Sequence, residues 1–209
     1  MVSPALAQGR GRVGAIGGAL LLDADFADGT QTTVGVTAGL ALLPWLDIEG
    51  DVLAPNGDVV REYTGTSVSF AAPGASREEI ERLAVVSRFT NQRQTRSVVA
   101  VVAALHTRRT DRRITPRLFV GFASHRIRDR RTLEHVAFPP GITLKRVNRM
   151  MQAEDIHMRQ IGGFSVGGSL ALRVAPRIDV APDVRDDYMS MGDEIYNAWR
   201  SSVRMTWRF

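Results

Sequence analysis

Three carboxylates alternate along one short segment of the chain. Asp47, Glu49 and Asp51 are each separated by a single residue. Because side chains two apart on a strand project to the same face, the three would lie together and could form a catalytic or metal site. On an interior face they would instead pair with inward arginines on other strands, and the candidates are Arg117, Arg177, Arg200 and Arg204. Buried charges need partners, which favours the ion-pair network.

A second motif, Gly163 to Gly167, spells the G-x-S-x-G string of serine hydrolases. That motif requires a strand, a sharp turn and a helix, with an acid and then a histidine after the serine. All four histidines precede Ser165 and none has metal-ligand spacing. We therefore interpret these glycines as close backbone contacts within a strand. The sequence predicts no catalytic, cofactor-binding or metal site, and no enzyme.

The composition narrows the class of protein. The 209 residues are 44% hydrophobic and 23% charged, with a net charge of +5 and no cysteine. These values exclude a disordered chain, a disulfide scaffold and a thiol enzyme. The arginines recur along the whole chain rather than on one helix or beside exposed aromatics, so we expect no nucleic-acid partner. No apolar run approaches the roughly 20 residues of a membrane-spanning helix.

Eight segments rich in Val, Leu, Gly, Ala and Thr are predicted to be strands. They are residues 12–24, 32–43, 45–54, 95–107, 114–125, 160–174, 177–187 and 194–209. The connections alternate between tight turns and longer loops, of which 55–94 and 126–159 are the longest. In an antiparallel meander this places the short turns at one rim and the long loops at the other. A capping-box pattern at Ser76 predicts a short helix in the first of these loops.

The last predicted strand has one apolar face and one cationic face. Its apolar face carries Trp199, Trp207 and Phe209, whereas Arg200 and Arg204 lie on the other. Ten residue steps cover about 33 Å, or about 25 Å along the membrane normal at the usual strand tilt, which equals the apolar band of an outer-membrane barrel. Trp45 also falls near a predicted strand end, where an indole ring suits the lipid headgroups.

The ending Y-N-A-W-R-S-S-V-R-M-T-W-R-F resembles the carboxy-terminal assembly signal of Gram-negative outer-membrane proteins. With eight strands and loops sorted to one rim, the chain resembles the small OmpA/OmpX-type barrels. The resemblance implies an all-β, eight-stranded, antiparallel up-and-down transmembrane barrel in the outer membrane. It also implies that the barrel assembly machinery reads the last strand through Phe209. The size of the long loops departs from the family.

Four arginines, Arg126, Arg128, Arg130 and Arg131, begin the loop predicted over 126–159. They could clamp the phosphates of lipopolysaccharide or form a solvated loop, and the sequence leaves both readings open. Residues 1–8 contain an A-x-A pattern that fits the remnant of a signal peptide or an Ala-rich terminus. The barrel domain is expected to cover residues 9–209.

Taken together, the sequence predicts a barrel with a structural or surface-interaction role, outer-membrane lipids as neighbours and no wide channel. The alternative is a soluble periplasmic lipocalin-like barrel that binds a small apolar ligand. It requires apolar side chains inside and the terminal arginines outside. A lipid-modifying enzyme is a third possibility, for which the sequence shows no convincing nucleophile and base.

Overall fold

The computed structural model describes residues 11–23, 29–67, 76–78, 85–107, 113–137, 155–191 and 194–209. These residues form nine strands: β1 (Gly11–Asp23), β2 (Gly29–Leu43), β3 (Leu46–Asn56), β4 (Val59–Ser67), β5 (Val85–His106), β6 (Ile114–Ala137), β7 (Asp155–Ala175), β8 (Ile178–Met191) and β9 (Glu194–Arg208). Residues 77 and 78 are helical, and the rest of the helix predicted there lies outside the described residues, as do residues 1–8. Within the described part of the chain, no helix is long and apolar enough to span a membrane.

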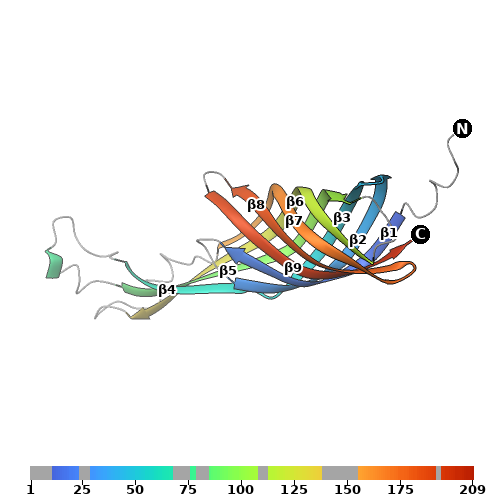
Figure 1. Cartoon of the computed structure of the whole chain (residues 1–209). Helices are drawn as coiled ribbons and strands as arrows, with labels where there is room; N and C mark the ends of the chain where they lie inside the picture. Colours follow the sequence, from blue (N-terminus) through green and yellow to red (C-terminus); the bar gives the residue numbers. More distant parts are fainter. Residues whose placement is uncertain are drawn as a thin grey trace, which may run out of the picture.

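The strands close into an antiparallel barrel. Their order is β3-β2-β1-β9-β8-β7-β6-β5-β4, and an additional pairing of β3 with β5 completes the ring. Strand β3 pairs with the second half of β5 and β4 with its first half, so β3 and β4 occupy one position in the wall. The barrel therefore has eight strands around its circumference, as the sequence predicts (Figure 1).

The seam of the barrel joins the first strand to the last. Strand β1 pairs with β9 from Arg12 opposite Arg208 to Asp23 opposite Asn197. The Phe209 N–H donates to the Gly11 carbonyl at 3.0 Å, and the Gly11 N–H donates to the Phe209 carbonyl at 3.3 Å. This closure and the pairing of β3 with β5 join the two edges of the sheet in the part of the barrel below β4, which is the condition for crossing a lipid bilayer with strands.

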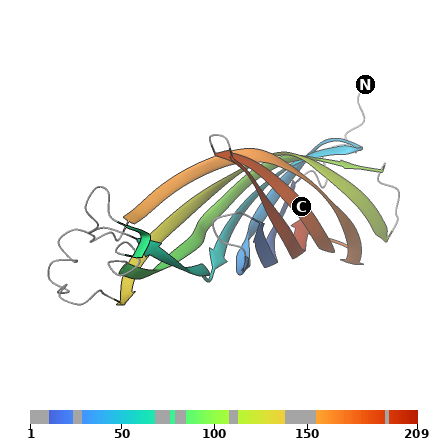
Figure 2. The same ribbon diagram turned by 90° about the vertical axis from the view of Figure 1, so that its left-hand side faces the viewer.

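One rim carries tight turns and the other carries long extensions. Strands β2 and β3 are joined at Pro44–Trp45, and β7 and β8 at Pro176–Arg177. We call this end, which also holds the paired ends of β1 and β9, the short-turn rim. At the opposite end, the extended rim, β4 reaches well beyond the rest of the barrel together with the adjoining parts of β5 and β6 (Figures 1 and 2).

The segments predicted as the two longest loops are partly strand, which corrects the sequence analysis. Strand β4 and the first ten residues of β5 (85–94) lie in the predicted loop 55–94. The outer end of β6 and the start of β7 lie in the predicted loop 126–159. In the outer part of β5 both faces carry polar side chains, with Arg93 on one face and Gln92 and Gln94 on the other. The alternation of apolar and polar residues that reveals a strand is therefore missing there.

A kink separates β3 from β4 at Gly57, whose φ of 98° is open to glycine and costly for other residues. Opposite this kink, β5 has a bulge between Thr95 and Ser97 that leaves Arg96 as an extra residue. The Gln31 side chain on β2 binds both irregular sites: its Nε2 donates to the Gly57 carbonyl, and its Oε1 accepts from the Thr95 N–H at 3.2 Å. We call this place, formed by Gln31, the Gly57 kink and the β5 bulge, the joint. It marks where the extension, made of β4 and the first part of β5, leaves the barrel.

Candidate functional site

Strand β3 places its three carboxylates inside the barrel. Asp47, Glu49 and Asp51 are at most 1% exposed, whereas Ile48 and Val52 between and beside them are exposed on the outer wall. The alternation follows directly from the two-residue period of a strand, and the lumen is the only interior that a small barrel offers.

The carboxylates meet arginines from four other strands. Arg12 Nη2 lies 2.7 Å from Asp47 and 2.5 Å from Glu49. Arg204 contributes Nη1 at 2.6 Å to Glu49 and Nη2 at 2.8 Å to Asp51. Arg117 pairs with Glu49 as well as with Asp47 at 3.1 Å. Each of these three arginines thus contacts two carboxylates.

Two residues of β8, Asp183 and Arg185, complete the cluster. Arg185 Nη1 lies 3.0 Å from Asp51, and Asp183 contacts both Arg185 and Arg204 at 3.3 Å. The Arg185 guanidinium also stacks over Phe119, with 4.1 Å between its carbon and the ring centroid. We call this cluster the lumen network, and its members are Arg12, Asp47, Glu49, Asp51, Arg117, Asp183, Arg185 and Arg204.

The structure brings together most of the predicted interior charges and separates one. Arg117 and Arg204 join the lumen network, and Arg200 reaches Asp51 at 4.0 Å. Arg177 does not join, because it occupies the exposed β7–β8 turn at the short-turn rim. The assignment of Arg177 to the lumen is therefore wrong. Strand β8 begins at Ile178, one residue after the predicted start, so Arg177 belongs to the turn.

Sequence reasoning missed Arg12, Asp183 and Arg185. A signal for the last two was present, because Asp183, Arg185 and Asp187 alternate along β8 as the three carboxylates do along β3. Arg12 shares its face with Ile16 and Leu20, both buried in the lumen, so the inward face of β1 also carried a usable pattern.

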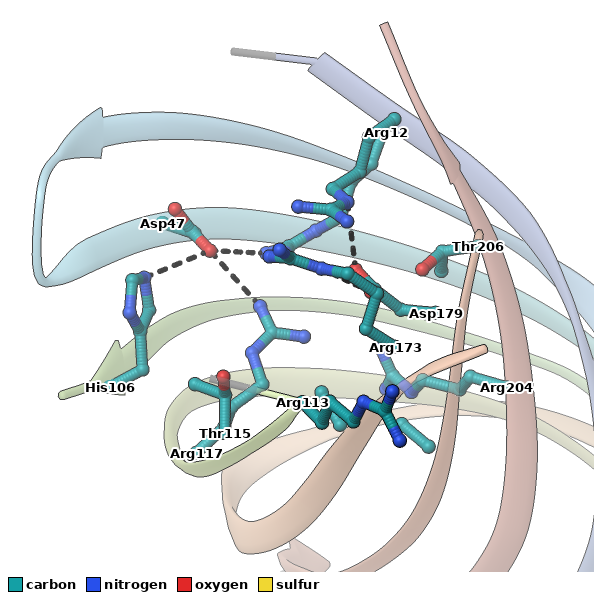
Figure 3. A pocket seen from close by; sticks show the side chains of 13 residues that line it. Arg12, Asp47, His106, Arg113, Thr115, Arg117, Arg173, Asp179, Arg204 and Thr206 are labelled. Atoms are coloured by element: carbon teal, nitrogen blue, oxygen red, sulfur yellow. Dashed lines mark hydrogen bonds and ion pairs between the residues drawn. The ribbon is translucent and has the colours of Figure 1, made fainter. Parts of the chain in front are cut away.

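The short-turn rim carries further arginines around the entrance to the lumen (Figure 3). Arg208 lies 3.0 Å from Asp179, and Arg173 lies 3.9 Å from the same carboxylate. His106 closes one side through a contact of 3.2 Å with Asp47. The hollow that these side chains line has a volume of about 30 Å³, which is enough for only a few water molecules.

A separate buried cluster lies in the lumen nearer to the extended rim. His125 Nε2 is 2.9 Å from Asp187, and Arg200 Nε is 2.9 Å from the same carboxylate. Ser165 hydrogen bonds Asp187 and Arg200. The serine thus contacts the acid rather than the histidine, whereas a nucleophilic serine must contact its general base. The G-x-S-x-G segment lies within strand β7, with no turn or helix after the serine.

His106 and His125 lie apart along the barrel. His106 pairs in register with Arg117, whereas His125 pairs with Val98, eight residues away along β5. Among the described residues, no group of three or more histidine, aspartate and glutamate side chains is arranged to hold a metal ion.

The outer wall is apolar over the height of the barrel. Trp45, Trp199 and Trp207 are each nearly half exposed, and Phe209 is 64% exposed. Trp45 and Trp207 lie at the short-turn rim, and Trp199 lies ten residues from Phe209 at the other edge of the band. Other exposed apolar side chains cover the wall between them, including Val34, Val36, Val101, Leu118, Val203 and Met205.

This distribution contradicts the lipocalin-like alternative. A soluble barrel that binds an apolar ligand would turn Trp207 inward and Arg204 outward. Instead Arg204 is 1% exposed and Trp207 is 48% exposed. The lumen holds the ion pairs together with a packed cluster of apolar side chains that includes Leu20 and Val98. A large apolar surface also lies outside, where only lipid can cover so much of it.

The four arginines of the β6 segment lie on a strand rather than in a loop. Arg126, Arg128 and Arg130 alternate with the inward Ile127 and Asp129, so all three lie on the outer face. We call them the arginine row. Arg131 pairs with the buried Asn91 and has the parity of the inward face, so it does not share a surface with the other three.

Neither a family model nor a curated protein matches this chain. Among solved structures, the fold is similar to that of Neisserial surface protein A, with a TM-score of 0.56 and 11% identity over 95% of this chain and 97% of the other. It is also similar to the N-terminal β-barrel domain of Pseudomonas aeruginosa OprF, with a TM-score of 0.52 and 11% identity over 97% of this chain and 100% of that domain. The outer membrane protein OprG of the same organism gives a TM-score of 0.52 and 9% identity, with 97% of each chain covered.

At these identities the similarity establishes the fold: the chain has the fold of the small eight-stranded outer-membrane β-barrels. Its own apolar wall and charged lumen agree with that class. The chain is therefore an outer-membrane β-barrel protein, with its apolar wall facing lipid.

Proposed function

We propose that this outer-membrane barrel has no wide channel and acts as a structural or surface-interaction protein. The observation that carries the proposal is the lumen network, whose side chains extend across the barrel from β3 to β1, β6, β8 and β9. Opening a path for solutes would require several buried ion pairs to separate. Removing one partner from a buried pair typically costs about 3–5 kcal/mol.

Electrical recording tests this proposal. The purified full chain, refolded into planar lipid bilayers, should give no steady conductance steps of the size that a porin gives when reconstituted in the same way. The expected trace is flat, because the ion pairs fill the lumen. Large, steady steps from the wild-type chain would contradict the proposal.

The proposed partners belong to the outer membrane. The arginine row supports a contact with lipopolysaccharide phosphates, since guanidinium groups bind phosphate through paired N–H donors. Strand β9 supports recognition by the barrel assembly machinery, because Val203, Met205 and Trp207 form an exposed apolar face that leads to the terminal Phe209, as in the assembly signal that the ending resembles. In this proposal the extended rim faces the cell exterior and the short-turn rim faces the periplasm.

We further propose that the protein is not an enzyme. The carboxylates that could act as acid or base are engaged by arginines, and Ser165 is fully buried in the lumen. A substrate would have no access to either set of groups. We expect no lipid hydrolysis and no acyl transfer by the refolded protein.

A further inference from the structure

The outer wall of β5 and β6 changes from apolar to cationic over a short distance. Along the outer face of β6, Leu118 and Phe122 are followed by Ser124 and then by the arginine row. Phe122 and Arg126 are four residues apart, about 13 Å along the strand. The last exposed aromatic side chain is thus close to the first guanidinium group on the same face.

An apolar groove lies on the part of this wall that is nearer to the short-turn rim. It has a volume of about 540 Å³, and its lining includes Val99, Val101, Phe122, Gly162 and Phe164. The Phe122 and Phe164 rings meet edge to face, with 5.2 Å between their centroids. Gly162 adds no side chain above them, so the wall is hollowed where its neighbours carry large groups. The groove suits a hydrocarbon chain.

A cationic hollow lies above the groove on the same face. It has a volume of about 230 Å³ and is lined by Arg96, Arg128 and Arg130 together with Gln92, Gln94 and Asp58. Asp58 accepts a hydrogen bond from Gln92, and it is the one carboxylate among these six lining residues. Three guanidinium groups against one carboxylate leave the hollow positively charged, and Arg126 stands exposed between it and the groove.

The β5 bulge is what brings Arg96 to this place. As the extra residue between Thr95 and Ser97, Arg96 adds a fourth cation to the outer face next to the arginine row. On the other side of the row, Ile156 and Met158 of β7 pair with Arg130 and Arg128 and are both exposed. Cations bordered by apolar side chains fit an amphipathic ligand better than a fully hydrated anion.

We propose that this wall holds one phosphorylated lipid of the outer leaflet, with a phosphate bound by Arg96, Arg126 and Arg128 and one acyl chain lying in the groove between Phe122 and Phe164. The occupant follows from the order of the two features: the apolar groove lies within the apolar band, and the guanidinium groups lie just beyond it, where lipid phosphates are found. The inference rests on the proposed phosphate contact of the arginine row and adds a binding groove for one acyl chain of the same lipid.

Native mass spectrometry of the refolded full chain in zwitterionic detergent tests the proposal, with diphosphorylated lipid A as the probe. The wild-type chain should retain one lipid per barrel. The variant Arg126→Gln/Arg128→Gln should bind it about tenfold more weakly or worse, because charge-assisted hydrogen bonds are lost. Arg131→Gln is the matched control, since it removes an arginine of the same strand from the opposite face, and it should bind as the wild type does.

The groove is tested by Gly162→Leu. A Cβ at this position meets only the Ala123 carbonyl at 3.9 Å, so the side chain can enter the groove without straining the wall. A Cβ at the adjacent Gly163 would lie 1.9 Å from the Tyr188 carbonyl, which makes that position unsuitable. Gly162→Leu should weaken lipid A binding several-fold and leave the fold intact. Val36→Leu, on the lipid-facing wall of β2, is the control for added bulk.

The outcomes separate the two levels of the proposal. If the arginine variant loses the lipid and Gly162→Leu retains it fully, the assignment of the groove to an acyl chain is wrong while the phosphate contact stands. If both variants bind as the wild type does, the phosphate contact fails as well. Complete displacement by inorganic phosphate, or equal binding of dephosphorylated lipid A, would overturn the assignment to a phosphorylated lipid.

Discussion

At the scale of single residues, Glu49 has the central position in the lumen. It contacts Arg12, Arg117 and Arg204, each from a different strand. One carboxylate thus ties β3 to β1, β6 and β9 across the barrel. Ion pairs of this kind contribute little over apolar packing, but breaking one leaves charges buried without compensation. The consequence is a strong dependence of stability on this one side chain.

Replacing Glu49 by Gln should therefore destabilise the barrel by about 3–5 kcal/mol, because three buried arginines lose a shared negative charge. The free energy of unfolding in urea, measured in lipid vesicles, provides the test. Glu62→Gln removes the same charge from an exposed position on β4 and should change the free energy of unfolding by no more than about 0.5 kcal/mol. Equal effects of the two variants would contradict the central place of Glu49.

At the scale of the elements, Gln31 decides how the extension leaves the barrel. Its amide satisfies the Gly57 carbonyl at the β3–β4 kink and the Thr95 N–H at the β5 bulge. Both backbone groups lie at irregular positions, where the regular ladder of hydrogen bonds is interrupted. A buried side chain, itself 1% exposed, thus replaces the missing ladder bonds.

The variant Gln31→Leu should leave these two backbone groups unpaired and cost about 1–3 kcal/mol. We also expect faster proteolytic cleavage within residues 57–97, because the joint would open more often. Thr30→Val, which alters the neighbouring exposed residue on the opposite face of β2, is the matched control. A cleavage rate equal to that of the control would show that the joint does not depend on Gln31.

The strands were predictable where one face is apolar and the other polar. On β9, Trp207 and Arg204 belong to faces of opposite character, and the strand was found with nearly its observed bounds. Strand β4 and the outer parts of β5 and β6 carry polar residues on both faces, so the period that marks a strand is absent. The same limit explains the arginine row, which the sequence placed in a loop.

The candidate site was predictable from parity but not from register. The alternation of Asp47, Glu49 and Asp51 identified an inward face on β3. Which arginines lie opposite them depends on how the strands are staggered around the barrel, and a shift of one residue exchanges the two faces. Parity also marks Arg12 and Arg185, which the sequence analysis missed, and Arg177 was wrongly included because it lies in the β7–β8 turn.

At the scale of the whole molecule, the barrel separates charge from lipid. The lumen network is buried inside, and the wall outside carries Leu118, Phe122 and Val203 in exposed positions. The three tryptophans lie near the edges of the apolar band, where an indole ring contacts both acyl chains and headgroups. The membrane location of the barrel depends on this orientation, since a barrel turned inside out would be soluble and its arginines would contact water.

Quenching of tryptophan fluorescence by brominated lipids tests this orientation most directly. In a chain with Trp45, Trp199 and Trp207 replaced by Phe, a single tryptophan is placed either at the outward Phe122 or at the inward Phe119, both on β6. Phe122→Trp should be strongly quenched, and Phe119→Trp should be almost unaffected because the lumen network surrounds it. In the wild-type chain, bromine near the headgroups should quench more than bromine near the chain ends. Quenching of Phe119→Trp with none at Phe122→Trp would contradict the account.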